Sequence, residues 1–240
     1  MKTLSLNIGT YNIAAGRQIG FDMSVIAHDI SEQKLDIIGI QEVDLNASRT
    51  KYIDMMKEIS QYSGYKYYAF FEALELSFYE GHSGSYGIGI LSKYPIISTE
   101  KIVINKGDKA DGVESRALGY AKIDVNGTLI NFFTTHLTIR RDADRIGEFA
   151  IIAEKTKNMK NVILTGDFNV RSLSEFDDLH HLSKVNNQKT PFESFPYDHR
   201  FIDNIIYSSE FSAMENSAGM RINHHSDHYM LYATLNLKCE

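Results

Sequence analysis

The chain has little of several residue types that mark special architectures: three prolines, one cysteine and no tryptophan in 240 residues. So few prolines exclude collagen-like and proline-rich structures. The single Cys239 cannot form an internal disulfide, so cysteine usage does not indicate an oxidising compartment. We interpret Cys239 as a thiol in the C-terminal tail.

Long apolar runs are also missing. A membrane-spanning helix needs roughly 20 consecutive apolar residues, and no segment approaches this. Residues 3–16 carry no charge, but Ser, Thr and Asn interrupt them repeatedly, whereas a signal peptide needs an unbroken apolar stretch. We therefore expect a soluble, cytoplasmic protein without stable membrane insertion.

Basic residues are outnumbered, since 25 Lys and Arg against 31 Asp and Glu give a net charge of −6. This balance weakens an interpretation as a polyanion binder with a broad basic face, although a focused phosphate site remains compatible with it. With 43% hydrophobic and 23% charged residues the chain is globular in composition. Its length favours one domain, residues 1–240.

Hydrophobic periodicity predicts many strands and a few helices. The dipeptide Asn126-Gly127 between two β-rich runs is a strong hairpin signal, because both turn positions need positive φ. These elements predict an α/β (α+β) layered domain. The predicted helices span 24–33, 51–63 and 143–157, and the predicted strands span 4–11, 36–41, 67–71, 88–91, 96–104, 117–125, 128–135, 162–165, 202–207 and 229–237.

Polar residues gather where predicted strands end or begin. Asn and Asp also form ordinary turns after strands, so one such segment alone indicates little. Five segments with complementary chemistry are harder to ascribe to chance. They are Gly9-Thr10-Tyr11-Asn12, Ile40-Gln41-Glu42-Val43, Thr134-Thr135-His136-Leu137, Gly166-Asp167-Phe168-Asn169 and Ser226-Asp227-His228.

The side chains in these segments suit metal-assisted hydrolysis. The oxygen ligands of Glu42, Asp227 and Asn12 match a hard divalent cation such as Mg²⁺. Histidines add acid–base capacity near neutral pH, and Asp203 is a candidate to orient His228. A metal, an imidazole and an orienting carboxylate together are typical of attack by water on a phosphoester.

The motifs in their order resemble the endonuclease/exonuclease/phosphatase superfamily, over almost the whole chain. This resemblance implies a four-layered α/β sandwich, with two packed, mostly antiparallel sheets flanked by helices, as in pancreatic deoxyribonuclease. Within the superfamily the chain is most similar to compact bacterial metal-dependent hydrolases. The matching segments are the five above, the run Tyr-Gly-Ile-Gly-Ile-Leu-Ser-Lys-Tyr-Pro-Ile at 86–96, Arg116, and Ile202-Asp203.

The resemblance implies that Glu42 is the principal metal ligand, with Asn12 and Asp227 completing or supporting the metal site. The expected cofactor is Mg²⁺, with Mn²⁺ as the alternative. One position departs from the family pattern: relatives commonly carry Asn where this chain has Ile88. A polar contact from that position is therefore not expected here.

The remaining roles also come from the resemblance. Asp167 and Asn169 are implied to orient the attacking water and the phosphate. His228, paired with Asp203, is implied as general base or transition-state stabiliser, and His136 as a phosphate-binding imidazole. Whether Asp167 or His228 takes the proton stays open.

The basic residues allow two interpretations. Arg116 matches a family position that supplies a cation near the phosphate, with a simple surface ion pair as the alternative. The run with Arg140, Arg141 and Arg145 is nearly balanced by acids and is typical of a helix N-terminus, with a phosphate contact as the alternative for Arg145.

Three other features have competing interpretations. His224, His225, Asp227 and His228 resemble a zinc cluster, but zinc would leave the other motifs without a purpose. The aromatic residues in 65–71 suit a strand better than base stacking. Residues 74–84 lack clear periodicity and are a candidate substrate-facing loop.

The sequence thus predicts a metal-dependent phosphoester hydrolase, with a small-molecule or lipid-derived phosphoester favoured as substrate. A DNA or RNA endonuclease or exonuclease is the leading alternative, since nucleic acid as a partner is not excluded. A phosphoryl-ligand binding module without turnover, or an interaction scaffold, is more remote.

Overall fold

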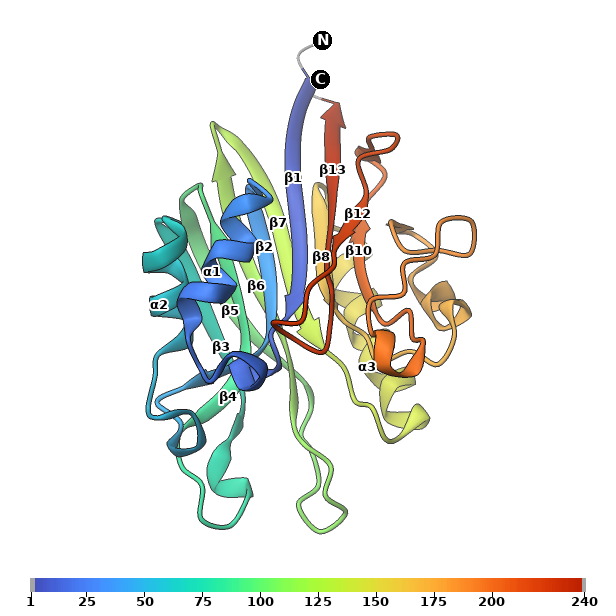
Figure 1. Cartoon of the computed structure of the whole chain (residues 1–240). Helices are drawn as coiled ribbons and strands as arrows, with labels where there is room; N and C mark the ends of the chain where they lie inside the picture. The colour runs from blue at the N-terminus through green and yellow to red at the C-terminus, as the bar shows by residue number, and fades with distance from the viewer. Residues whose placement is uncertain (1–2, 239–240) are drawn as a thin grey trace.

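Two packed β-sheets form the centre of the protein (Figure 1), as seen in a computed structural model that describes residues 3–238. Cys239 lies outside the described residues. The first sheet has the strand order β11-β13-β1-β2-β4-β3, with β12 also paired to β13. Its strands are β1 (Thr3–Asn12), β2 (Ile37–Leu45), β3 (Tyr67–Glu75), β4 (Ser85–Ser92), β11 (Phe211–Ala213), β12 (Gly219–Arg221) and β13 (Met230–Lys238).

The second sheet has the order β5-β6-β7-β8-β10-β9. In the two sheets, the β1–β2 and β7–β8 pairs are parallel and the other strand pairs of residues 3–238 are antiparallel. The strands of this sheet are β5 (Ile96–Asn105), β6 (Arg116–Val125), β7 (Thr128–His136), β8 (Val162–Asp167), β9 (Ser183–Lys184) and β10 (Asp203–Tyr207).

Helices cover the outer face of each sheet, so the predicted four-layered sandwich is confirmed. The helices α1 (Met23–Glu32) and α2 (Met55–Ser63) pack on the first sheet through one apolar cluster, and α3 (Asp142–Thr156) packs on the second through another. A third cluster fills the space between the sheets, and Ile88 belongs to it, which explains an apolar residue there. Short 3-10 segments complete the chain: η1 (Ala14–Ile19), η2 (Ser48–Thr50), η3 (Leu76–Phe78), η4 (Leu173–Leu179) and η5 (Pro196–Asp198).

The helix predicted at 51–63 begins later than expected. Lys51 and Tyr52 have positive φ of 58° and 60°, which interrupts the helix before it can start there. Asp54 then caps α2 by accepting a hydrogen bond from the Lys57 amide at 3.1 Å, and Gly64 ends the helix with φ of 78°. The predicted Asn126-Gly127 hairpin is confirmed, with φ of 53° and 91°.

The strand topology brings the polar motifs to one edge of the sandwich. In the parallel pairs Asn12 lies opposite Gln41, and His136 lies opposite Asp167. Antiparallel β10 begins where β8 ends, so Asp203 also lies opposite Asp167. The start of β1 and the end of β13 lie at the far end of the sheets (Figure 1).

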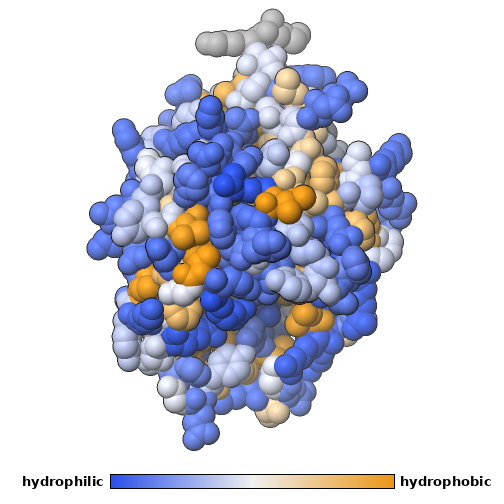
Figure 2. All heavy atoms as spheres, viewed as in Figure 1, coloured by the Kyte–Doolittle hydropathy of each residue, from blue (hydrophilic) through white to orange (hydrophobic). Residues whose placement is uncertain are grey.

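The surface in Figure 2 is mostly hydrophilic, and its apolar side chains form small separate patches. No helix within residues 3–238 is long and apolar enough to span a bilayer. The aromatic residues of 65–71 are divided as strand alternation predicts, since Tyr65 and Phe71 are buried and Tyr68 is 41% exposed.

Candidate functional site

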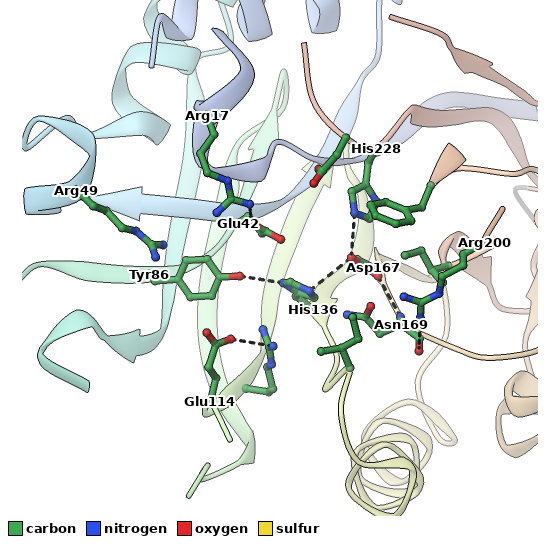
Figure 3. A pocket seen from close by; sticks show the side chains of 15 residues that line it. Arg17, Glu42, Arg49, Tyr86, Glu114, His136, Asp167, Asn169, Arg200 and His228 are labelled. Atoms are coloured by element: carbon green, nitrogen blue, oxygen red, sulfur yellow. Dashed lines mark hydrogen bonds and ion pairs between the residues drawn. The ribbon is translucent and has the colours of Figure 1, made fainter. Parts of the chain in front are cut away.

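A cleft of about 320 Å³ opens at the sheet edge where the motifs meet (Figure 3). The predicted residues that line the cleft are Glu42, Arg116, His136, Asp167, Asn169, Asp227 and His228. Two further predicted residues, Asn12 and Asp203, lie directly behind its wall, where they contact lining side chains. The structure therefore brings all nine predicted site residues together.

Glu42 enters the cleft from a β-bulge. In β2, Gln41 pairs with Ile88 and Val43 with Gly87, which leaves Glu42 as the extra residue, with φ of 56°. The bulge turns the carboxylate of Glu42 out of the sheet and into the cleft. There its Oε2 accepts a hydrogen bond from Arg17 Nη2 at 3.0 Å.

Asn12 holds two carboxylates in place. Its Oδ1 accepts a hydrogen bond from the Ala14 amide at 3.0 Å, and this contact fixes the orientation of the carboxamide. Its Nδ2 therefore faces the acids and donates to Glu42 Oε1 at 3.2 Å and to Asp167 Oδ2 at 3.0 Å. In this geometry Asn12 supports the carboxylates, and its carbonyl oxygen is already occupied.

Asp167 lies at the centre of the site. Its Oδ2 is surrounded by Asn12 Nδ2, by His136 Nε2 at 3.5 Å and by His228 Nε2 at 3.6 Å. Its Oδ1 accepts a hydrogen bond from the Asn169 amide at 3.0 Å. Burial and the nearby charge of Asp203 raise the pKa of Asp167.

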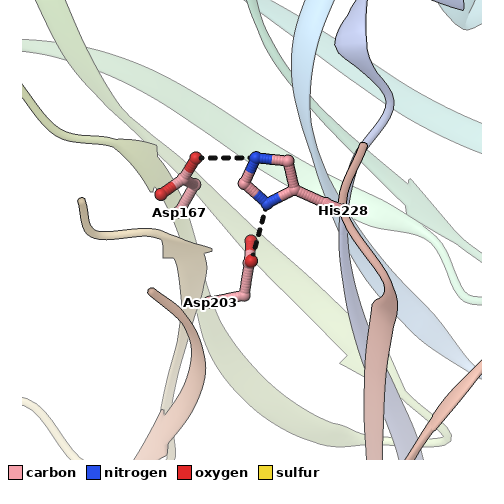
Figure 4. Close-up of side chains that lie close together, drawn as sticks. All are labelled: Asp167, Asp203 and His228. Atoms are coloured by element: carbon pink, nitrogen blue, oxygen red, sulfur yellow. Dashed lines mark hydrogen bonds and ion pairs between the residues drawn. The ribbon is translucent and has the colours of Figure 1, made fainter. Parts of the chain in front are cut away.

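Asp203 orients His228 as predicted (Figure 4). His228 Nδ1 lies 2.8 Å from Asp203 Oδ2, while the other oxygen of Asp203 has no hydrogen-bond partner among the described residues. Phe195 covers the imidazole, with ring centres 4.9 Å apart. Burial lowers the pKa of His228, but the charges of Asp203 and Asp167 outweigh it, so the net shift is upward.

Burial and the charges of Arg116 and His228 favour the neutral form of His136, because they lower its pKa well below the usual value. Burial likewise raises the pKa of Tyr86. The Tyr86 hydroxyl lies 3.2 Å from His136 Nδ1. Donation from this hydroxyl to Nδ1 would leave the proton of a neutral imidazole on Nε2, which faces Asp167.

Asn169 follows β8 in a left-handed conformation, with φ of 50°. Its Nδ2 donates to the Leu137 carbonyl at 2.9 Å, which connects the ends of β7 and β8. Its own carbonyl accepts a hydrogen bond from Arg200 Nη2 at 3.2 Å. Asn169 thus links the cleft wall to Arg200.

Four arginines surround the cleft, although the sequence shows no basic run. Arg17, Arg49, Arg116 and Arg200 come from four distant segments and all line it. Arg49 is held by both oxygens of buried Asp44, at 2.8 Å each. Local charge at the cleft therefore differs from the net charge of the chain.

Arg116 is not a surface ion pair, so that alternative was wrong. Only 5% of the residue is exposed, and its Nη2 pairs with Glu114 Oε2 at 2.9 Å. Arg116 is the first residue of β6, so this strand starts at the cleft. Its position agrees with a cation near a bound phosphate.

Arg145 lies outside the cleft, so its suggested phosphate role is wrong. The residue is fully buried, and its guanidinium pairs with Glu175 at 2.9 Å and with Asp142 at 2.7 Å. These contacts join α3 to η4. Arg145 is a structural residue.

The zinc-cluster alternative also fails. His225 Nδ1 lies 2.8 Å from buried Asp29, away from the cleft. Within residues 3–238, the one group of three or more potential ligand side chains is Asp167, Asp203 and His228. Both imidazole nitrogens of that group already face carboxylates, so it suits proton handling better than metal binding.

The donors that face the cleft fit a hard cation. Glu42 and Asp227 offer carboxylate oxygens on the cleft wall, and Asn12 steadies Glu42 from behind. Oxygen-only donors in small number match Mg²⁺, which keeps several waters.

A layered sandwich with acids and histidines at one strand edge fits a phosphoester hydrolase. The chain belongs to the endonuclease/exonuclease/phosphatase family, whose model matches residues 9–228. Members of this family hydrolyse phosphoesters. No curated protein matches the chain in sequence.

Solved structures share the fold at low sequence identity. An endonuclease/exonuclease/phosphatase from Beutenbergia cavernae has a TM-score of 0.81 and 18% identity, covering 97% of this chain and 72% of the other. A mannosyl-6-phosphatase from Bacteroides thetaiotaomicron has a TM-score of 0.67 and 19% identity, covering 96% and 99%. TDP2 from D. rerio, in complex with a single-strand DNA product, has a TM-score of 0.73 and 16% identity, covering 97% and 99%.

Three features escaped the sequence analysis. Tyr86 stands inside a matched motif, but no role was assigned to it and the predicted strand began at residue 88. Arg17, Arg49 and Arg200 are isolated in the sequence, and no local pattern distinguishes them from surface arginines. Phe195, which covers His228, is likewise surrounded by unremarkable loop residues.

Proposed function

We propose that the chain is a single-domain, divalent-metal-dependent phosphoester hydrolase that prefers Mg²⁺ and accepts Mn²⁺. The observation that supports this proposal most directly is the position of Asp167. Its Oδ2 lies among the nitrogens of Asn12, His136 and His228, in a cleft that Glu42 and Asp227 also line.

Glu42 and Asp227 would hold the cation, and Asn12 keeps Glu42 in its bulged position. The bound cation neutralises charge on phosphoryl oxygens and lowers the pKa of a coordinated water. Arg17 pairs with the same carboxylate, so it is placed to contact an anionic substrate beside Glu42.

Asp167 and Asn169 orient the attacking water. The two follow β8 together, and the Asn169 amide fixes Asp167 Oδ1 at 3.0 Å, while Asp167 Oδ2 faces the nitrogens of Asn12, His136 and His228. We assign proton acceptance to Asp167 because it is the carboxylate at the centre of the cleft. Its raised pKa agrees with that role.

The two histidines donate to the phosphoryl group. Asp203 holds His228 by Nδ1, so Nε2 faces the reacting centre, as in other carboxylate–imidazole pairs. Tyr86 orients His136 in the corresponding way through its Nδ1. Two fixed donors stabilise charge that develops on the phosphate in the transition state.

A small phosphoester is the favoured substrate class. The cleft of about 320 Å³ suits a ligand of limited size, and the net charge of −6 disfavours a long polyanion. A nuclease is the second candidate, favoured by the four arginines around the cleft. The fold admits both, because its neighbours include a mannosyl-6-phosphatase and a DNA-bound TDP2.

The test is an activity panel on the full chain with Mg²⁺, with Mn²⁺ and with chelator. The substrates are bis-p-nitrophenyl phosphate, p-nitrophenyl phosphate, inositol and lipid phosphates, and supercoiled plasmid. We expect turnover of small esters that chelator abolishes and Mg²⁺ restores. Full turnover in chelator, in protein shown to be metal-free, would contradict the metal role, and rapid plasmid nicking would favour the nuclease.

A further inference from the structure

A second cavity of about 150 Å³ adjoins the cleft. The two share Glu114, Arg116 and Ile139 in their walls, so Arg116 borders both. Tyr79 and Arg140 line only the second cavity.

The shared wall presents a buried guanidinium with unused donors. Arg116 is 5% exposed, and its Nε and Nη1 have no hydrogen-bond partner among residues 3–238. Its single carboxylate partner, Glu114, uses one oxygen for Arg116 Nη2 and the other for the Tyr79 hydroxyl. Arg116 lines both cavities although its Nε and Nη1 are themselves buried, so its positive charge acts on a ligand there.

A second cation lies at the outer end of this cavity. Arg140 is exposed, and within the described part of the chain its side chain makes no ion pair or hydrogen bond. A Cβ atom on Gly112 would lie 3.6 Å from Arg140 Nη1, which places the guanidinium against the β5–β6 loop. The wall of the cavity thus has two arginines and one carboxylate, which is already paired.

The loops around the cavity are tied together before any ligand binds. Lys109 Nζ donates to the Ser77 carbonyl at 3.3 Å, and Ser115 donates to the Ala73 carbonyl, which joins the β5–β6 loop to the β3–β4 segment. Asp108 and Val113 form a β-bridge within the β5–β6 loop. The predicted substrate-facing segment 74–84 therefore contributes through Tyr79.

We propose that this second cavity binds a second phosphate group of the substrate, so that the enzyme prefers small molecules with two phosphates. The inference rests on the proposed hydrolase function and names its substrate class. Arg116 contacts the second phosphate from inside and Arg140 from the solvent side. Guanidinium groups match phosphate oxygens in geometry as well as charge.

The test measures competitive inhibition of bis-p-nitrophenyl phosphate hydrolysis in Mg²⁺. The inhibitors are glucose 6-phosphate and glucose 1,6-bisphosphate, each against wild type, Arg140→Gln and the control Arg171→Gln. Arg171 is a 64% exposed arginine that lines neither cavity, so its variant removes the same charge elsewhere.

We expect the bisphosphate to inhibit wild type about ten- to a hundredfold more strongly than the monophosphate. Arg140→Gln should remove most of this difference, and Arg171→Gln should retain it and turn over the reporter ester with the kcat of wild type. Equal inhibition by both sugars, or an unchanged ratio in Arg140→Gln, would overturn the inference while reporter turnover upholds the hydrolase. Absence of reporter turnover would instead count against the proposed function.

A pair of nucleotides tests whether the second phosphate comes from the end of a nucleic acid strand instead of a small molecule. Thymidine dinucleotide is compared with and without a 5′-phosphate in the same assay. The assignment to small molecules would be overturned if the 5′-phosphate strengthened inhibition more than the second phosphate of the hexose does, and if Arg140→Gln removed that increase.

Discussion

Single residues at the strand ends carry the chemistry proposed here, and most were recognisable in the sequence. Glu42, Asp167 and His228 stand in short motifs that indicate little one by one, so they were found through the number and order of these motifs along the chain. Tyr86 could not be found in this way, because its hydroxyl meets His136 only after 50 residues of chain have folded. The tautomer of His136 depends on that contact.

The pair of Asp203 and His228 gives the first prediction. His228→Ala should lower kcat by about a hundred- to ten-thousandfold, because it removes a fixed proton donor. Asp203→Asn should lower kcat by a smaller factor, since the imidazole remains but loses the charge that orients it. Rates are measured by single-turnover kinetics, with circular dichroism to show intact folding. Near-normal turnover in a folded His228→Ala variant would refute the role of His228.

Tyr86→Phe should lower kcat by about fivefold, because a lost hydroxyl contact of about 1 kcal/mol frees the tautomer of His136. The control is Tyr120→Phe, which loses a hydrogen bond of 2.7 Å to Asn131 far from the cleft. Its kcat should be unchanged. If both variants show the same kcat as wild type, Tyr86 does not position His136.

Among the elements, β2 shows where sequence reasoning reaches its limit. The predicted strand ended at 41, but β2 runs from Ile37 to Leu45 and bulges at Glu42. Alternation cannot reveal a bulge, because the extra residue is defined by pairing with β4. The strands β9, β11 and β12 were also missed, since two or three residues carry no period.

The close approach of the two sheets beneath the site gives the third prediction. A Cβ on Gly39 would lie 2.1 Å from Thr165 Oγ1 and 2.4 Å from Thr134 Oγ1, so Gly39→Ala forces the sheets apart. We expect it to lower the free energy of unfolding by about 1–3 kcal/mol. Urea titration measures this change.

The control is Gly147→Ala in α3, where nothing lies within 4 Å of the added Cβ. Because Ala favours a helix more than Gly does, the free energy of unfolding of this variant should rise by about 1 kcal/mol. Unchanged stability in Gly39→Ala would show that the sheets are not packed as tightly as described.

At the scale of the whole molecule, the net charge of −6 does not describe the cleft, which four arginines and four carboxylates line. The layered fold could be predicted from strand and helix periods together with the ordered motifs. The arginine-lined cleft could not, because its members lie at positions 17, 49, 116 and 200 and meet only in the folded protein.

Salt dependence distinguishes a small-ester hydrolase from an enzyme that tracks a polyanion. Each neutralised phosphate on DNA contributes a slope of about −0.9 in log K against log salt. With one or two phosphates bound, kcat/KM for a small ester should depend only weakly on salt at fixed free Mg²⁺. A steep slope with plasmid as substrate, reduced by Arg17→Gln, would favour the nuclease.

The central claim is that Glu42 holds a divalent cation that hydrolysis requires. The most direct measurement is the dependence of kcat/KM for bis-p-nitrophenyl phosphate on Mg²⁺ concentration, in wild type, Glu42→Gln and Glu154→Gln. Glu154 is 70% exposed in its side chain and lies on α3 away from the cleft, so its variant is the matched control. We predict that Glu42→Gln needs at least about tenfold more Mg²⁺ and loses most activity, while Glu154→Gln follows wild type. Identical Mg²⁺ curves for all three proteins would contradict the account.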